Sequence, residues 1–166
     1  PPHASSAASD VYKRQMYCYG LRPSEVFGSN VNQEDKTCTV LGLKGEEDEL
    51  EERTAFTLDK SLVDTFDLNN IDRPWEYNMS DKKYDATYSK IKTDQMGKRL
   101  KKIIKKEKFP QFTMNMIRHS WAKRAIKSEV SSSDCAMSMG YSIEVFQDKY
   151  LSSIKKLVGD DIQDTK

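Results

Sequence analysis

Two arginines and one tyrosine are the residues of this chain whose types suggest a joint chemistry. Arg118 lies in FTMNMIRHSWAKRAI (112–126), Tyr150 ends SSSDCAMSMGYSIEVFQDKY (131–150), and Arg22 lies far upstream in YGLRPSEV (19–26). A guanidinium group is planar, permanently charged and able to bind two phosphate oxygens at once, and a tyrosine hydroxyl can serve as a covalent nucleophile. These residue types suit attack on a phosphodiester, provided that the fold brings them together.

The size and composition of the chain fit one domain with one hydrophobic core, because it has 166 residues, of which 37% are hydrophobic and 32% charged. The net charge is only +1, so the charge of the whole chain carries little information about nucleic acid. Its distribution is more informative, since residues 90–108 hold nine Lys or Arg against two acids. An amphipathic helix with a solvated basic face and a helix that faces phosphates both fit this segment.

Other classes of site have little support in the sequence. The three cysteines, Cys18, Cys38 and Cys135, are odd in number and lack metal-like spacing, which favours reduced thiols in a cytosolic protein. No apolar run approaches the roughly 20 residues that span a membrane, and we expect no secretory segment. We therefore predict no metal site and no membrane partner.

Periodicity and turn residues predict a mainly helical chain with one small region of strands. Residues 1–15 are small, polar and without periodicity, and we expect them to be a leader outside the fold, either non-native or disordered. We expect residues 159–166 to fray. Between these ends, the predicted elements are a helix beginning at Pro23, strands at 37–44 and 53–58 around an acidic turn (46–52), helices at 59–71, 88–108, 115–130 and from Ser142 onward, and a loop at 72–87.

Tyr150 has two interpretations on these grounds. The first is a core aromatic, because Tyr150 falls on an i, i+4 apolar stripe of the last predicted helix. That stripe comprises Val145, Phe146, Tyr150, Ile154, Leu157 and Val158. The second is a hydroxyl that faces a pocket lined by guanidinium groups. Arg22 also has a simpler interpretation, because an arginine at such a position, taken alone, is expected to be a surface residue.

Four segments, taken together, resemble the catalytic domain of the tyrosine recombinase (phage integrase) family. They are YGLRPSEV (19–26), LKG (43–45) before a strand that ends in FTL (56–58), NMIRHSWAKRAI (115–126) and MGYSIEVFQDKY (139–150). The resemblance implies an α+β, mainly α fold over residues 16–158: a helical catalytic domain of the DNA breaking-rejoining type with a small antiparallel β-hairpin or sheet. It also implies a C-terminal fragment that lacks the family's N-terminal core-binding domain and the usual helix before Arg22.

The resemblance further implies a chemical role for particular residues. Tyr150 would attack a scissile DNA phosphate and form a 3′-phosphotyrosine bond, while Arg22 and Arg118 hold the non-bridging oxygens. Lys44 would protonate the leaving 5′-oxygen. The implied partner is double-stranded DNA, bound by a tetramer of this chain, with no cofactor and no small-molecule substrate. The implied setting is cytoplasmic, in a bacterial or phage-encoded mobile element.

Two positions depart from the family pattern and keep other hypotheses open. Asn115 and Tyr141 stand where the family has a histidine and a His or Trp, and we expect both to be auxiliary hydrogen-bond donors. His119 is expected to pack or to support a neighbouring residue of the site rather than to serve as a substitute base. One alternative is a decayed integrase that binds DNA without cutting it. Another is a helical interaction domain with a basic face, in which the candidate site residues would lie far apart.

Overall fold

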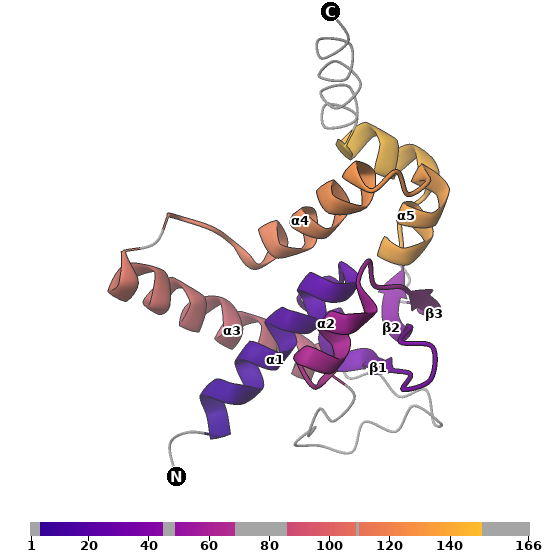
Figure 1. The fold of residues 1–166 in the computed structure, drawn as a ribbon. Helices are drawn as coiled ribbons and strands as arrows, with labels where there is room; N and C mark the ends of the chain where they lie inside the picture. Colours follow the sequence, from indigo (N-terminus) through magenta and orange to yellow (C-terminus); the bar gives the residue numbers. More distant parts are fainter. Residues whose placement is uncertain (1–3, 45–48, 69–85, 109, 151–166) are drawn as a thin grey trace, which may run out of the picture.

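The computed structural model describes residues 4–44, 49–68, 86–108 and 110–150, which form helices around one small sheet (Figure 1). Residues 143–150 are also helical and follow α5 closely. In chain order, the other elements are α1 (Ala4–Tyr19), η1 (Glu25–Gly28), β1 (Ser29–Val31), β2 (Cys38–Lys44), β3 (Glu49–Ala55), α2 (Lys60–Thr65), α3 (Ala86–Glu107), α4 (Met114–Lys127) and α5 (Ser132–Met139). The expected α+β, mainly α class with a small antiparallel sheet is confirmed.

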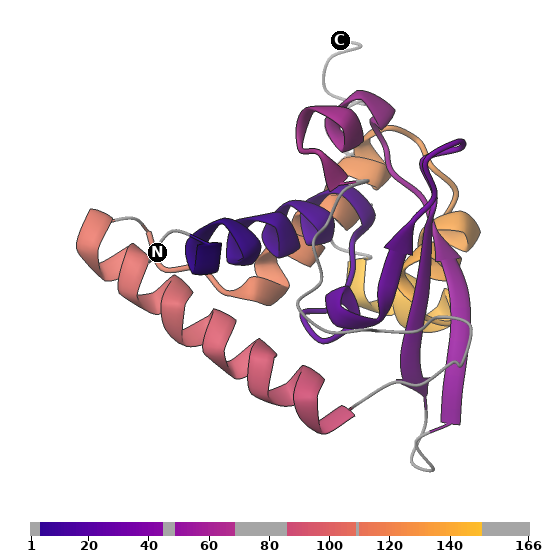
Figure 2. The ribbon, with the colours of Figure 1, turned by 90° about the horizontal axis from the view of Figure 1, so that it is seen from below.

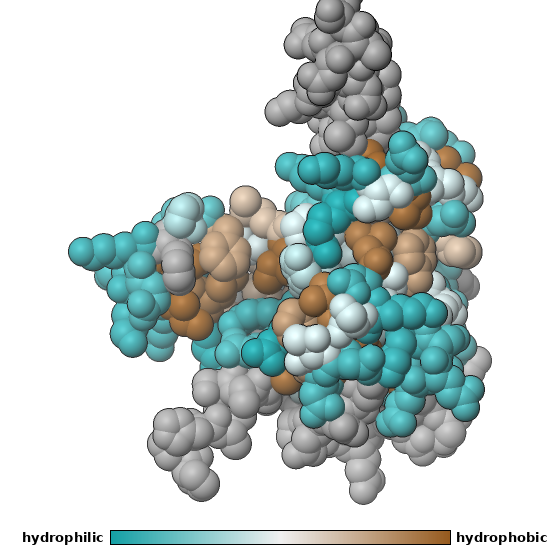
Figure 3. All heavy atoms as spheres, viewed as in Figure 1, coloured by the Kyte–Doolittle hydropathy of each residue, from teal (hydrophilic) through white to brown (hydrophobic). Residues whose placement is uncertain are grey.

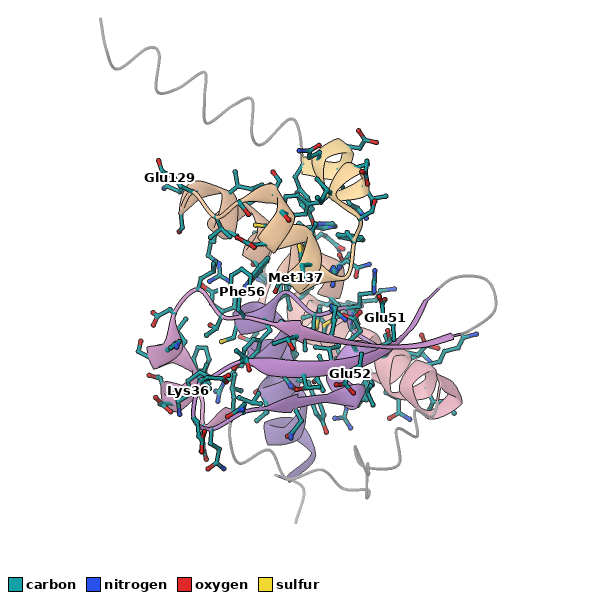
Figure 4. The ribbon with its side chains drawn as sticks, turned by 90° about the vertical axis from the view of Figure 1, so that its right-hand side faces the viewer. Lys36, Glu51, Glu52, Phe56, Glu129 and Met137 are labelled. Atoms are coloured by element: carbon teal, nitrogen blue, oxygen red, sulfur yellow. The ribbon has the colours of Figure 1, made fainter. Side chains whose placement is uncertain are left out.

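The sheet has the order β1-β2-β3, and both pairings are antiparallel. β1 was absent from the sequence prediction. Three of the acids expected in the turn, Glu49, Glu51 and Glu52, lie in β3 instead, where Glu51 and Glu52 are labelled in Figure 4. An edge strand tolerates these charges because one of its sides is open to solvent. Residues 45–48, the rest of the predicted turn, lie outside the described residues.

The helix α1 changes the expected beginning of the fold. We expected residues 1–15 to lie outside the fold and no helix to precede Arg22, but α1 runs from Ala4 to Tyr19. Tyr12, Gln15, Met16 and Tyr19 are buried, and their i, i+3, i+4, i+7 spacing crosses the boundary that composition suggested at residue 15. α1 packs beside α4, and α3 lies along the same side of the molecule (Figure 2).

The described residues bury two apolar clusters. The first joins α1 and the sheet to Met96, Leu100 and Ile104 of α3. The second, which carries the candidate site, surrounds Trp121 of α4 with residues from α5 and from the helix at 143–150. The apolar stripes predicted for α3 and for the last helix include residues that are not buried. Ile91, Ile103 and Val145 are 50%, 40% and 47% exposed. Figure 3 shows such hydrophobic surface on the α3 side, next to the hydrophilic end of that helix.

Most of the predicted helices are confirmed with shifted bounds. Asp59 caps α2 as expected, since its carboxylate accepts a hydrogen bond from Ser61 N at 2.9 Å. The predicted loop at 72–87 falls mostly on residues 69–85, outside the described residues, as do Ile154, Leu157 and Val158 of the last predicted stripe. In the described part of the chain, no helix is both long and apolar enough to cross a membrane.

Candidate active site

The carboxylate of Glu25, the first residue of η1, is the centre of a buried group of charges. Its side chain is 3% exposed and accepts hydrogen bonds from Arg22 Nη1 at 2.6 Å, Arg53 Nη2 at 2.9 Å and Arg118 Nη1 at 3.4 Å. Burial acts to raise the pKa of Glu25, but the three guanidinium charges outweigh it and hold the pKa below its ordinary value. A buried carboxylate is stable only with such partners. We call Arg22, Arg53 and Arg118 the arginine cluster.

Arg118 connects the ends of two helices. It lies on α4 and is 2% exposed. Its Nη1 donates to the carbonyl of Gly20, just after α1, at 2.7 Å, and its Nη2 donates to the carbonyl of Met139, at the end of α5, at 2.5 Å. Carbonyls at helix C-termini carry partial negative charge and favour a cation there. Arg118 Nε is buried without a hydrogen-bond partner among the described residues.

Arg22 and Arg53 also donate hydrogen bonds to backbone carbonyls at the C-terminal end of α5. Arg22 Nη2 donates to Gly140 O at 3.0 Å, and Arg53 Nε donates to Ser138 O at 3.1 Å. Gly140 ends α5 with a φ of 63°, a conformation that glycine adopts without strain. The arginine cluster thus joins η1, β3, α4 and the turn that leads to Tyr141. Figure 4 labels Phe56, just after β3, and Met137 of α5, beside which Ser138 Oγ accepts from Phe56 N at 3.2 Å.

Tyr141 is the aromatic side chain that faces the arginine cluster. The guanidinium carbons of Arg118 and Arg22 lie 4.7 and 5.3 Å from the ring centroid, and Lys149 Nζ lies 4.9 Å from it. Lys149 Nζ also donates to Tyr141 Oη at 3.2 Å. Burial acts to raise the pKa of Tyr141, but the charge of Arg118 and the hydrogen bond from Lys149 lower it below the ordinary value. Three cations around one half-buried ring create a positive local potential that can attract an anion.

Tyr150 lies next to this place, but among the described residues its hydroxyl bonds to a histidine and not to an arginine. It is 3% exposed, and its ring packs on Phe146 at a centroid distance of 4.8 Å. Tyr150 Oη is 2.6 Å from His119 Nδ1. Burial, and to a smaller degree Tyr141, raises the pKa of Tyr150 to about 12. The expectation that Tyr150 faces a guanidinium pocket directly is therefore not met, and the apolar periodicity of its helix predicted its burial correctly.

Lys44 and Asn115 are not brought to the arginine cluster by any described contact. Lys44 is the last residue of β2 and pairs in register with Glu49, while its side chain lies outside the description. Asn115 is exposed on α4, one turn before Arg118. Within the described residues, the side chain of Asn115 makes no hydrogen bond.

Sequence reasoning missed residues that complete the site. Glu25 had a usable signal, because an acid three residues after Arg22 can reach back to it. Arg53 had none, since it stands among acids in a strand. His119 was expected to pack or to support a neighbouring residue of the site rather than to serve as a base, and it bonds to the Tyr150 hydroxyl, while Lys149 was not considered. Among the described residues, no group of three His, Cys, Asp or Glu side chains can hold a metal ion, and the three cysteines are buried and form no disulfide with one another.

Solved structures similar to this chain are recombinases. A XerH site-specific recombinase bound to its difH substrate in a pre-cleavage complex matches 89% of this chain at 15% identity, with a TM-score of 0.52. XerH in a post-cleavage complex with a palindromic difH substrate matches 97% at 14% identity and a TM-score of 0.57. XerA recombinase matches 97% at 14% identity and a TM-score of 0.59. The likeness is one of fold, so the chain has the mainly helical fold of the tyrosine recombinase type.

The match is partial in two respects. The chain spans 43%, 47% and 64% of the lengths of those three recombinase chains. No family model matches the sequence, and no curated protein matches it.

Proposed function

We propose that this chain catalyses site-specific cleavage and rejoining of DNA strands through a 3′-phosphotyrosine bond to Tyr150. The observation that carries the proposal is the meeting of Arg22 and Arg118, from distant parts of the chain, around Tyr141 and beside the helix that bears Tyr150. The fold likeness to recombinases supports it. The XerH structures hold a difH substrate, which supports double-stranded DNA as the partner of this chain.

The arginine cluster suits the binding of a phosphate in the transition state. Arg22 is the accessible member, with a side chain 38% exposed, whereas Arg118 is buried and bound to helix-end carbonyls. In the proposed role, Arg22 and Lys149 contact the non-bridging oxygens, Arg118 supplies charge from behind the Tyr141 ring, and the Tyr141 hydroxyl donates a hydrogen bond. Preorganised donors of this kind contribute about 100- to 1,000-fold each to the rate.

The proposed reaction conserves the energy of the broken phosphodiester bond in the phosphotyrosine bond. Tyr150 Oη attacks phosphorus, the bond from phosphorus to the 5′-oxygen breaks, and Lys44 gives its proton to the leaving oxygen. The 5′-hydroxyl of a partner strand then attacks the phosphotyrosine and restores the phosphodiester. Asn115 serves as an auxiliary donor. In this scheme four copies of the chain assemble on DNA, as expected for integration or excision of a mobile element in a bacterial or phage system.

The burial of Tyr150 sets a requirement on this reaction. Because the side chain is 3% exposed, the surroundings of the helix at 143–150 must open enough for a phosphate to reach Oη. A decayed integrase that binds DNA without cutting it is the second candidate function, and this burial is the observation that favours it. A helical domain with scattered site residues is disfavoured, since Arg22 and Arg118 share Glu25.

A suicide substrate separates the two candidates. Nicked duplexes of randomised sequence are incubated with the protein, so that the short fragment released on cleavage diffuses away and the covalent complex persists in denaturant. The proposal predicts a protein–DNA band with the wild type and none with Tyr150→Phe. Salt-sensitive binding of duplex DNA without that band supports the binding module instead.

A further inference from the structure

We propose that His119 is the general base that accepts the Tyr150 proton during strand cleavage, an inference that rests on the proposed function. A general base must lie within about 2.6–3.2 Å of the atom whose proton it takes. His119 Nδ1 lies 2.6 Å from Tyr150 Oη. The rings meet edge to face, with centroids 5.7 Å apart and planes at 61°, so the hydroxyl approaches a nitrogen at the imidazole edge.

The charges around His119 favour the protonation state that a base needs. Burial, and then the positive charges of Lys149, Arg118 and Lys123, lower the pKa of His119. Lys149 lies on the helix of Tyr150, and Arg118 and Lys123 lie on α4 with His119 itself. Each of these influences favours the neutral imidazole over the imidazolium. A neutral ring accepts at Nδ1 when its proton is on Nε2, and in this tautomer, which the proposed role requires, the Tyr150 phenol donates to His119 Nδ1.

The described residues offer Tyr150 no other acceptor. Its hydroxyl has His119 as its one hydrogen-bond partner among them. Asn115, at the position where the resembling family has a histidine, cannot take a proton. Tyr150 has a pKa of about 12 and is thus overwhelmingly protonated near pH 7, which makes a base necessary for rapid attack.

The proposed step balances without a further reactant. As Oη bonds to phosphorus, the phenol proton moves to His119 Nδ1, and the imidazole becomes an imidazolium. The bond from phosphorus to the 5′-oxygen breaks, and that oxygen takes a proton from the acid already assigned. In the reverse step, the imidazolium returns its proton to Oη as the partner strand's hydroxyl displaces it. General base catalysis of this kind contributes about 100- to 10,000-fold.

The test compares single-turnover rates of covalent complex formation across pH for the wild type and two variants. In the wild type, the rate rises with pH as His119 loses its proton, and it levels off above the midpoint of that titration. His119→Asn places an amide oxygen near the position of Nδ1 and keeps a hydrogen bond, but it cannot be protonated. We expect its rate to fall about 100- to 10,000-fold and the low-pH limb to disappear.

Lys123→Gln is the second variant, and it tests the role of His119 even if the His119→Asn protein does not fold. It removes one charge that lowers the pKa of His119, so we expect the midpoint of the wild-type limb to move to higher pH. An unmoved midpoint, or a His119→Asn rate within about threefold of wild type with the same limb, overturns the role of His119 and leaves the proposed function standing. A wild type that forms no covalent complex overturns both.

Discussion

Arg22 and Arg118 bind the same carboxylate, that of Glu25, although they come from distant parts of the chain. Arg22 Nη1 donates to one oxygen of Glu25 at 2.6 Å, and Arg118 Nη1 donates to the other at 3.4 Å. The shared carboxylate offsets their repulsion and fixes their relative positions. Glu25 therefore organises the candidate site although it contacts no reacting group.

Replacement of Glu25 tests this organising role. Glu25→Gln leaves Arg53 and Arg118 without a counter-charge in a buried position, and breaking a buried ion pair costs about 3–5 kcal/mol. We expect the free energy of unfolding, measured in urea at pH 7, to fall by about that amount. A loss below about 1 kcal/mol would contradict the role given to the carboxylate.

The pH dependence of stability should report the same carboxylate. The pKa of Glu25 in the fold lies below its ordinary value of 4.5, so its contribution is complete above the unfolded pKa and is lost as pH falls through the folded pKa. We expect the stability difference between wild type and Glu25→Gln to be largest near pH 7 and to shrink below about pH 4.5. Urea titrations at several pH values measure it, and a difference independent of pH would argue against the assignment.

Gly140→Ala tests the turn that joins α5 to Tyr141. An added Cβ would lie 3.0 Å from Arg53 Nε, and the residue would keep a φ of +63°. A non-glycine residue in this left-handed region costs about 1–2 kcal/mol, so we expect the midpoint temperature of thermal unfolding to fall. Gly97→Ala in α3 is the matched control, because its Cβ would meet nothing within 4 Å. Alanine is the better helix former by about 1 kcal/mol, so the control should be stabilised.

The basic side of α3 should contact DNA phosphates if the proposed function is right. Lys98, Lys102 and Lys105 are exposed and follow one another at i, i+4 and i+7, which places them on one face. Replacing all three with glutamine should weaken duplex binding and flatten the dependence of log affinity on log salt, by about 0.9 for each lysine that contacts a phosphate. Replacing the same three with arginine keeps the charge and should preserve the slope. An unchanged slope in the glutamine variant would mean that α3 does not face DNA.

Sequence patterns predicted what depends on local periodicity. The helices α3 and α4 and the capped start of α2 follow from apolar spacing and from Asp59. The same rule, applied to Tyr12, Met16 and Tyr19, would have found α1, but composition at residues 1–15 obscured it. The predicted start of β3 was too late because a run of acids is typical of a turn. In the fold, an edge strand accommodates these acids.

The candidate site depends on contacts between distant segments, and here the sequence carried less information. Arg22 and Arg118 were singled out by residue type and by the resemblance, but only the folded structure shows that both bind Glu25. The pairing of His119 with Tyr150 likewise requires the helix at 143–150 to pack on α4. Periodicity predicted that Tyr150 is buried, while the resemblance drew attention to its hydroxyl, and the structure contains both features.

The most direct measurement is mass spectrometry of the covalent complex formed on the nicked duplexes, after digestion with protease and nuclease. Of the described residues, two tyrosines compete near the arginine cluster, the buried Tyr150 and the half-buried Tyr141. The account predicts a nucleotide attached to the peptide that contains Tyr150, and an unmodified Tyr141. Attachment at Tyr141, or no nucleotide-bearing peptide at all, would contradict it.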